Sequence, residues 1–72
     1  MNDEFEKYVN EPLWPILVET VHTIVMYPHH KAYVAEKLLN EHPDIAPRKL
    51  AIELGISFGE ALVILYEIKK KV

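Results

Sequence analysis

One stretch near the C-terminus constrains the fold more than any other part of this 72-residue chain. It reads Leu50-Ala51-x-x-Leu54-Gly55-Ile56-Ser57, within residues 45–68. Apolar residues at helical spacing are followed by Gly55, which accepts the left-handed backbone that closes a helix. Ser57 and Glu60 then form the S-x-x-E capping box that opens a helix. The sequence therefore predicts two helices, 47–54 and 57–71, joined by a tight glycine turn.

Prolines and turn residues divide the rest of the chain into further helical segments. Asp3 can cap a short first helix, which Pro12 ends because a helix rarely continues up to a proline. A second helix is expected from about residue 14 to 26, stopped by Tyr27-Pro28, and a third from about 30 to 40. No segment has a convincing strand pattern, so the expected fold class is all-α.

Composition limits what the chain can be. Seventy-two residues make a single domain, 1–72, in which N-terminal helices over 1–28 precede a core over 29–72. Half of the residues are apolar, more than a disordered chain carries. The absence of cysteine excludes a disulfide and a thiolate metal site, and it fits a reducing, cytoplasmic setting. The acidic N-terminus is not a secretory signal, and the longest apolar run is too interrupted to span a membrane.

Charge is distributed unevenly along the chain. The formal net charge is −3, and residues 1–30 carry five acidic side chains against Lys7 alone. The remainder, 31–72, is close to neutral, with a run of lysines at its end. An acidic protein is repelled by phosphate at long range, so nucleic-acid binding would require a local basic patch.

The C-terminal half resembles the tri-helical core of helix-turn-helix domains, as in winged-helix regulators and bacterial repressors. Residues 30–40 correspond to the supporting helix, 47–54 to the first motif helix and 57–71 to the recognition helix. Ala51 matches a small residue at a close helix crossing, and Gly55 matches the turn. The other matches are apolar core positions: Leu50, Leu54, Ile56, Ala61 and Ile64. The division by proline and glycine predicts an all-α domain of four short helices, and the resemblance implies that the C-terminal three form a helix-turn-helix-like core.

Three features depart from the DNA-binding members of that family. Ala46 stands where they usually have a Ser or Thr cap, and the chain ends at Val72, so no wing is expected. The third departure is the outward face of the last helix, which lacks the Arg, Lys, Asn and Gln side chains that read base edges. That face carries Ser57, Phe58, Gly59, Leu62, Val63 and Tyr66. Direct base reading is therefore disfavoured.

The apolar side chains of that face require something to cover them. Together, Phe58, Leu62, Val63 and Tyr66 would expose a patch of the size that marks an interaction site. A protein partner or a second copy of the chain would cover them, with Trp14 as a further aromatic anchor. Alternatively, the helix around Trp14 folds back over the face within the monomer, or the face meets DNA.

No group of residues points to catalysis or metal binding. The histidines, His22, His29, His30 and His42, include no H-x-x-x-H pair that would place two of them on one helical face. Ser57 is the only serine, and its capping role accounts for it. No glycine-rich phosphate-binding motif occurs. We therefore expect no enzymatic activity, no cofactor and no metal site.

The expected function is a small, non-enzymatic accessory module that acts through protein contact or self-association. A setting in transcription or DNA metabolism is implied by the resemblance alone. The alternative is a direct DNA-binding transcriptional regulator that grips the phosphate backbone. Its contacts would come from Arg48, Lys49, Ser57, Lys69, Lys70 and Lys71.

Overall fold

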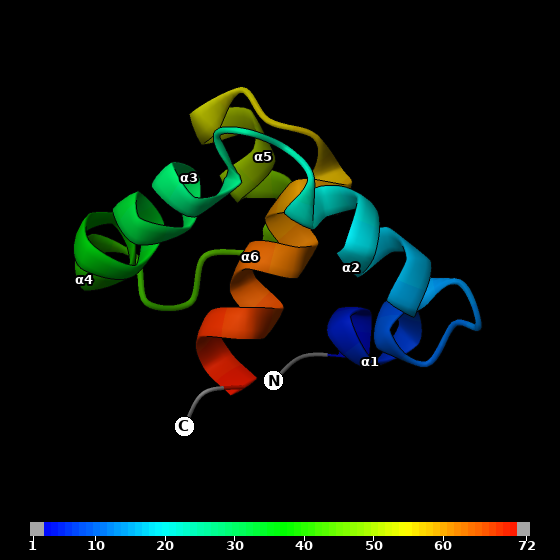
Figure 1. The fold of residues 1–72 in the computed structure, drawn as a ribbon. Coiled ribbons are helices and arrows are strands. Elements are labelled where there is room, and N and C mark those ends of the chain that lie inside the picture. Colours follow the sequence, from blue (N-terminus) through cyan, green and yellow to red (C-terminus); the bar gives the residue numbers. More distant parts are fainter. Residues whose placement is uncertain (1–2, 71–72) are drawn as a thin grey trace.

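A computed structural model describes residues 3–70, and the side chains from Glu6 onward. Every regular element in this range is helical, which confirms the all-α prediction (Figure 1). The elements are α1 (Asp3–Val9), α2 (Trp14–His22), α3 (Tyr27–Tyr33), η1 (Val34–Leu38), α4 (Leu39–Glu41), α5 (Pro47–Leu54) and α6 (Phe58–Lys70). The capping side chain predicted for Asp3 lies outside the described part. None of the helices over 3–70 has the length and apolarity needed to cross a bilayer.

The last helix, α6, is the central element of the fold. It contacts α2, α3 and α5, and in Figure 1 it passes between α2 on one side and α3 on the other. Six consecutive residues, 60–65, are buried. A helix that is buried all round must be apolar on every side, which the sequence Ala-Leu-Val-Ile-Leu supplies. The helix therefore serves as the core around which the others pack.

The boundary between the second and third helices differs from the sequence prediction. Helix α2 ends at His22 rather than near residue 26, and α3 begins at Tyr27, where the sequence suggested a stop. Pro28 lies in the first turn of α3, where a missing amide hydrogen costs no helical hydrogen bond. The expectation that Tyr27-Pro28 ends a helix is thus wrong, because the same dipeptide is equally suited to starting one.

A π-helical turn interrupts the long helical run from Tyr27 to Glu41. This turn is η1, and the amide of Leu39 donates to the carbonyl of Val34, five residues back. Val34 and Leu38 are both buried. Turns of this kind occur inside α-helices and are frequent at functional sites. The helix predicted over 30–40 therefore exists, although it starts earlier and contains a wider turn.

The predicted glycine turn is present between α5 and α6. Gly55 has a φ of 67°, in the left-handed region, and the amide of Ile56 donates to the carbonyl of Ala51 at 3.1 Å. Ser57 caps α6, because its hydroxyl accepts the amide hydrogen of Glu60 at 3.0 Å. The other half of the capping box is replaced, since the Glu60 carboxylate binds His30 instead.

Candidate ligand-binding groove

The residues predicted to dock a partner are covered within the monomer. Leu62 is 2% exposed, Val63 is fully buried and Trp14 is buried. Phe58 and Tyr66 are partly buried against the same core. Of the alternatives that the sequence left open, the structure has the one in which the helix around Trp14 folds back over this face within the monomer, joined by α1.

Aromatic contacts and one glycine explain how the N-terminal helices cover α6. The ring of Tyr8 meets Phe58 edge-on at 5.5 Å, and the ring of Trp14 meets Tyr66 edge-on at 5.3 Å. A Cβ atom on Gly59 would come within 3.1 Å of a Leu17 methyl group, so glycine permits the close approach of α2. The face is thus occupied by residues more than 40 positions away in sequence.

Most of the side chains predicted to contact DNA already interact with other residues of the chain. The guanidinium of Arg48 lies 4.4 Å from the centre of the Phe58 ring, a cation–π distance. The ammonium of Lys49 lies 3.8 Å from the Glu53 carboxylate, the i,i+4 pair of α5. Ser57 caps α6, and Lys69 also has an interaction within the chain. Lys71 lies outside the described residues, and Lys70 is treated with the groove below.

Polar side chains converge on Glu67, in the last turns of α6. His22, at the end of α2, places Nε2 2.8 Å from one carboxylate oxygen. From α3, the Tyr27 hydroxyl donates to the other oxygen, and the Lys31 ammonium donates to it at 3.2 Å. One carboxylate therefore joins three helices.

This environment shifts the pKa of two of these groups. Burial alone would raise the pKa of Glu67, but hydrogen bonds from Tyr27, His22 and Lys31 outweigh it and hold the pKa below its ordinary value of 4.5. Burial, followed by the hydrogen bond to Glu67, raises the pKa of the Tyr27 hydroxyl well above its ordinary value. At neutral pH the carboxylate is therefore ionised and the phenol is protonated, so the phenol acts as a donor.

A second carboxylate, that of Glu60, links α3 to α6 about two helical turns before Glu67. Glu60 is 4% exposed, and its carboxylate lies 2.7 Å from Nδ1 of His30. A buried carboxylate without a partner would be costly, and His30 satisfies it. Consecutive residues of α3, His30 and Lys31, thus reach two acidic residues of α6 that are seven positions apart.

Beside the Glu67 cluster, a surface groove runs between α3 and α6. Its polar end has a volume of about 480 Å³ and is lined by His22, Tyr27, Lys31, Tyr66, Glu67 and Lys70. Its apolar end has a volume of about 490 Å³ and is lined by Tyr27, Pro28, Lys31, Ala32, Ala35 and Ile68. The two ends share Tyr27 and Lys31, so they adjoin each other, and together we call them the α3–α6 groove. Apolar lining with a few convergent polar groups is typical of ligand sites.

The charge of the α3–α6 groove favours an anionic group. Glu67 is balanced by Lys31, with which it pairs at 3.2 Å. Lys70 lies 5.5 Å from the centre of the Tyr66 ring, and no carboxylate among residues 6–70 lies within ion-pair distance of its ammonium. The polar end therefore has one lysine without an ion-pair partner among residues 6–70.

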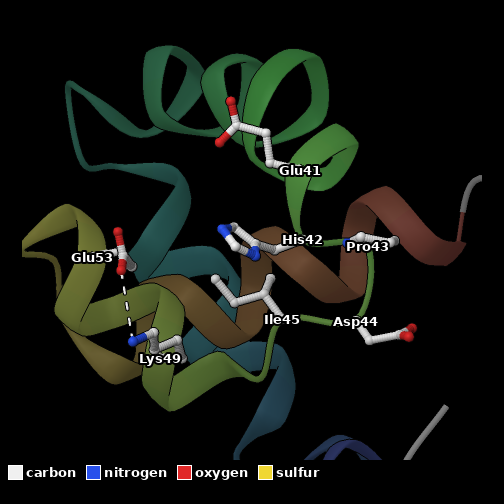
Figure 2. Close-up of a pocket in the computed structure, with 7 residues that line it drawn as sticks. All are labelled: Glu41, His42, Pro43, Asp44, Ile45, Lys49 and Glu53. Carbon is white, nitrogen blue, oxygen red and sulfur yellow. Dashed lines mark ion pairs between the residues drawn. The ribbon is translucent and has the colours of Figure 1, made fainter.

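Another depression, of about 450 Å³, lies where the turn after α4 meets α5 (Figure 2). Its acidic side chains do not converge: Glu41 and Asp44 point away from His42, and Glu53 is paired with Lys49. Within the described range, 6–70, no group of three or more His, Asp or Glu side chains could hold a metal ion. The α3–α6 groove is therefore the stronger candidate site.

The sequence indicated only part of this groove. Tyr66 and Lys70 were named in other roles, whereas Tyr27 was interpreted as part of a helix stop. A helix starting at Tyr27 would have placed Tyr27 and Lys31 on one face at i,i+4 spacing, and that was the available signal. Nothing in the local pattern pairs either residue with Glu67.

Comparisons with protein-family models, with curated protein sequences and with solved structures find no match to this chain. Membership of a helix-turn-helix family therefore stays a prediction from the residues quoted above.

Proposed function

We propose that this protein is a small, non-enzymatic binding module whose α3–α6 groove holds a segment of a partner protein. The segment carries an aliphatic side chain for the apolar end and a carboxylate for the polar end. The single observation that supports this most is that an apolar and a polar depression adjoin each other at Tyr27 and Lys31. A partner segment fits an open surface groove, because small ligands are usually held in enclosed pockets.

The chemistry of the Glu67 cluster favours binding over catalysis. His22, Tyr27 and Lys31 all direct their polar atoms at one carboxylate. A group acting as a general base or nucleophile has to face its substrate, and these groups face Glu67. These contacts therefore hold the side chains of the cluster in place as one wall of the groove.

Direct DNA recognition is the weaker proposal. A recognition helix inserts an exposed face into the major groove, whereas residues 60–65 of α6 are buried. Arg48 and Lys49, which would contact phosphates, already lie against Phe58 and Glu53. A role in transcription would then come through a protein partner.

Amide shifts in a two-dimensional NMR spectrum test the binding proposal. The probe is a short helical peptide with a leucine and a glutamate four residues apart, and its matched control has glutamine in place of glutamate. We expect saturable shifts in 27–35 and 66–70, with the glutamate peptide bound more tightly. Lys70→Glu should weaken binding about threefold to fivefold, because an exposed ion pair contributes up to about 1 kcal/mol.

The matched control variant is Lys37→Glu, which reverses an exposed lysine on η1 that does not line the groove. It should leave the affinity nearly unchanged. Amide shifts that map outside the groove would contradict the proposal. So would equal affinity of the unmodified protein for the glutamate and glutamine peptides.

A further inference from the structure

Two large aliphatic side chains stay exposed at the start of α2. Leu13 is 67% exposed and Ile16 is 57% exposed, although both are large enough to belong in a core. They are three residues apart, so they lie on one side of the helix. Neither side chain belongs to the core, whereas Trp14, which lies between them in the sequence, is buried.

An apolar depression adjoins Leu13, which is one of the residues that line it. It has a volume of about 310 Å³ and is lined by Tyr8, Glu11, Leu13, Trp14 and Leu17. Three of the lining side chains, Tyr8, Trp14 and Leu17, are held in place by the contacts with α6 described above. The depression and the exposed aliphatic residues form one surface, which we call the α1–α2 surface. It is separate from the α3–α6 groove, with which it shares no residue.

The α1–α2 surface is acidic. Glu11 lines the depression, and Glu19 follows Ile16 by three positions on α2, so it lies on the same side of that helix; both side chains are exposed. Among residues 6–70, no cation lies within ion-pair distance of either carboxylate. An apolar depression next to unpaired carboxylates is complementary to a segment that is both apolar and basic.

We propose that the α1–α2 surface docks a basic amphipathic segment of a partner protein. An aliphatic side chain of that segment enters the depression beside Trp14, and its lysines or arginines face Glu11 and Glu19. The same charges disfavour a second copy, because a symmetric contact places like surfaces opposite each other. They also disfavour an anionic lipid surface.

Trp14 provides a direct readout, because it is the only tryptophan in the chain and forms part of the depression wall. The probe is a synthetic helical peptide without tryptophan, with leucines at i, i+3 and i+4 spacing and lysines elsewhere. The matched control peptide replaces every lysine with glutamate. We expect a saturable change in Trp14 emission with the lysine peptide, weakening as salt is raised, and none with the glutamate peptide.

Two variants distinguish binding at the α1–α2 surface from nonspecific hydrophobic binding. Ile16→Asp should weaken the lysine peptide about tenfold, because it places a charge in the apolar contact. Ile52→Asp is the matched control, since Ile52 is 78% exposed on α5 and does not line the depression. Both changes replace exposed side chains, so both variants should keep the thermal unfolding midpoint of the unmodified chain. Lys70→Glu should leave this binding intact, which keeps the result independent of the α3–α6 groove.

Equal responses to the two peptides would overturn the proposal, as would an Ile16→Asp variant that binds as well as Ile52→Asp. Sedimentation velocity measures whether the unmodified chain forms a dimer. If the unmodified chain dimerises without peptide, and Ile16→Asp abolishes the dimer, the occupant is a second copy and the basic partner is excluded.

Discussion

At the residue scale, Glu67 is the side chain on which most long-range polar contacts depend. Its carboxylate accepts from donors on α2 and α3 that are 36, 40 and 45 positions away in sequence. Such contacts form only when the three helices are packed together. Because the carboxylate is about four-fifths buried, with its side chain 21% exposed, solvent screens these contacts less than it screens a surface ion pair.

Replacing Glu67 with glutamine should lower the free energy of unfolding by about 1–2 kcal/mol at neutral pH, because hydrogen bonds to a charged acceptor are lost. The pKa of this carboxyl group is lower in the folded state than its ordinary value of 4.5. Its contribution is therefore present above that value and is lost as the pH falls through the folded-state pKa. Urea unfolding at neutral pH and at about pH 3 measures the difference between the two proteins, which should shrink in acid.

Glu53→Gln is the control for this prediction. Glu53 pairs with Lys49 at 3.8 Å on an exposed helix face, so its loss should cost less than about 0.5 kcal/mol. A Glu67→Gln difference that is the same at both pH values would show that the charge of Glu67 does not stabilise the fold.

At the element scale, the turn between α5 and α6 depends on one backbone conformation. Gly55 has a positive φ, and an added Cβ atom would meet no other atom within 4 Å. The constraint at this position is therefore conformational and does not come from packing. By contrast, Gly59 is constrained by packing, because its Cβ would approach Leu17 at 3.1 Å.

Gly55→Ala should lower the free energy of unfolding by about 1–2 kcal/mol, since a Cβ is disfavoured in the left-handed region. Gly55→Asn should lose less, because asparagine tolerates that region better than alanine. Chemical denaturation of the three proteins measures this order. If alanine and asparagine were equally tolerated, the turn would have to adopt another conformation in solution.

At the scale of the whole molecule, the position of α6 at the centre decides which surfaces are available. The apolar face of α6 is covered by α1 and α2, while the α3–α6 groove and the α1–α2 surface stay open. The open surfaces differ in charge: among residues 6–70, Lys70 in the groove and Glu11 at the α1–α2 surface have no ion-pair partner. The two proposals therefore predict partner segments of opposite charge.

A short labelled DNA duplex should show no saturable binding at micromolar protein, either at about 50 mM or at about 200 mM salt. The net charge of −3 repels phosphate, and the recognition-helix position is occupied by a buried helix. Fluorescence anisotropy measures this directly. Micromolar binding that weakens with salt would favour the DNA-binding regulator instead.

The sequence by itself determined the all-α class and the local geometry of the turn between α5 and α6. Gly55 in the left-handed region, Ser57 as the cap and Pro47 in a first turn all depend on residues within a few positions of one another. Such interactions are encoded in local spacing, so they can be predicted from it. The Lys49–Glu53 pair was predictable for the same reason.

Only the tertiary structure decided what covers α6 and where the candidate site lies. Leu62 and Val63 present the same sequence pattern whether their own chain or a partner buries them. The start of α3 at Tyr27 was equally undetermined, because a proline at the next position suits a helix end and a helix beginning alike. The Glu67 cluster joins helices more than 30 residues apart, and no local periodicity records such a contact.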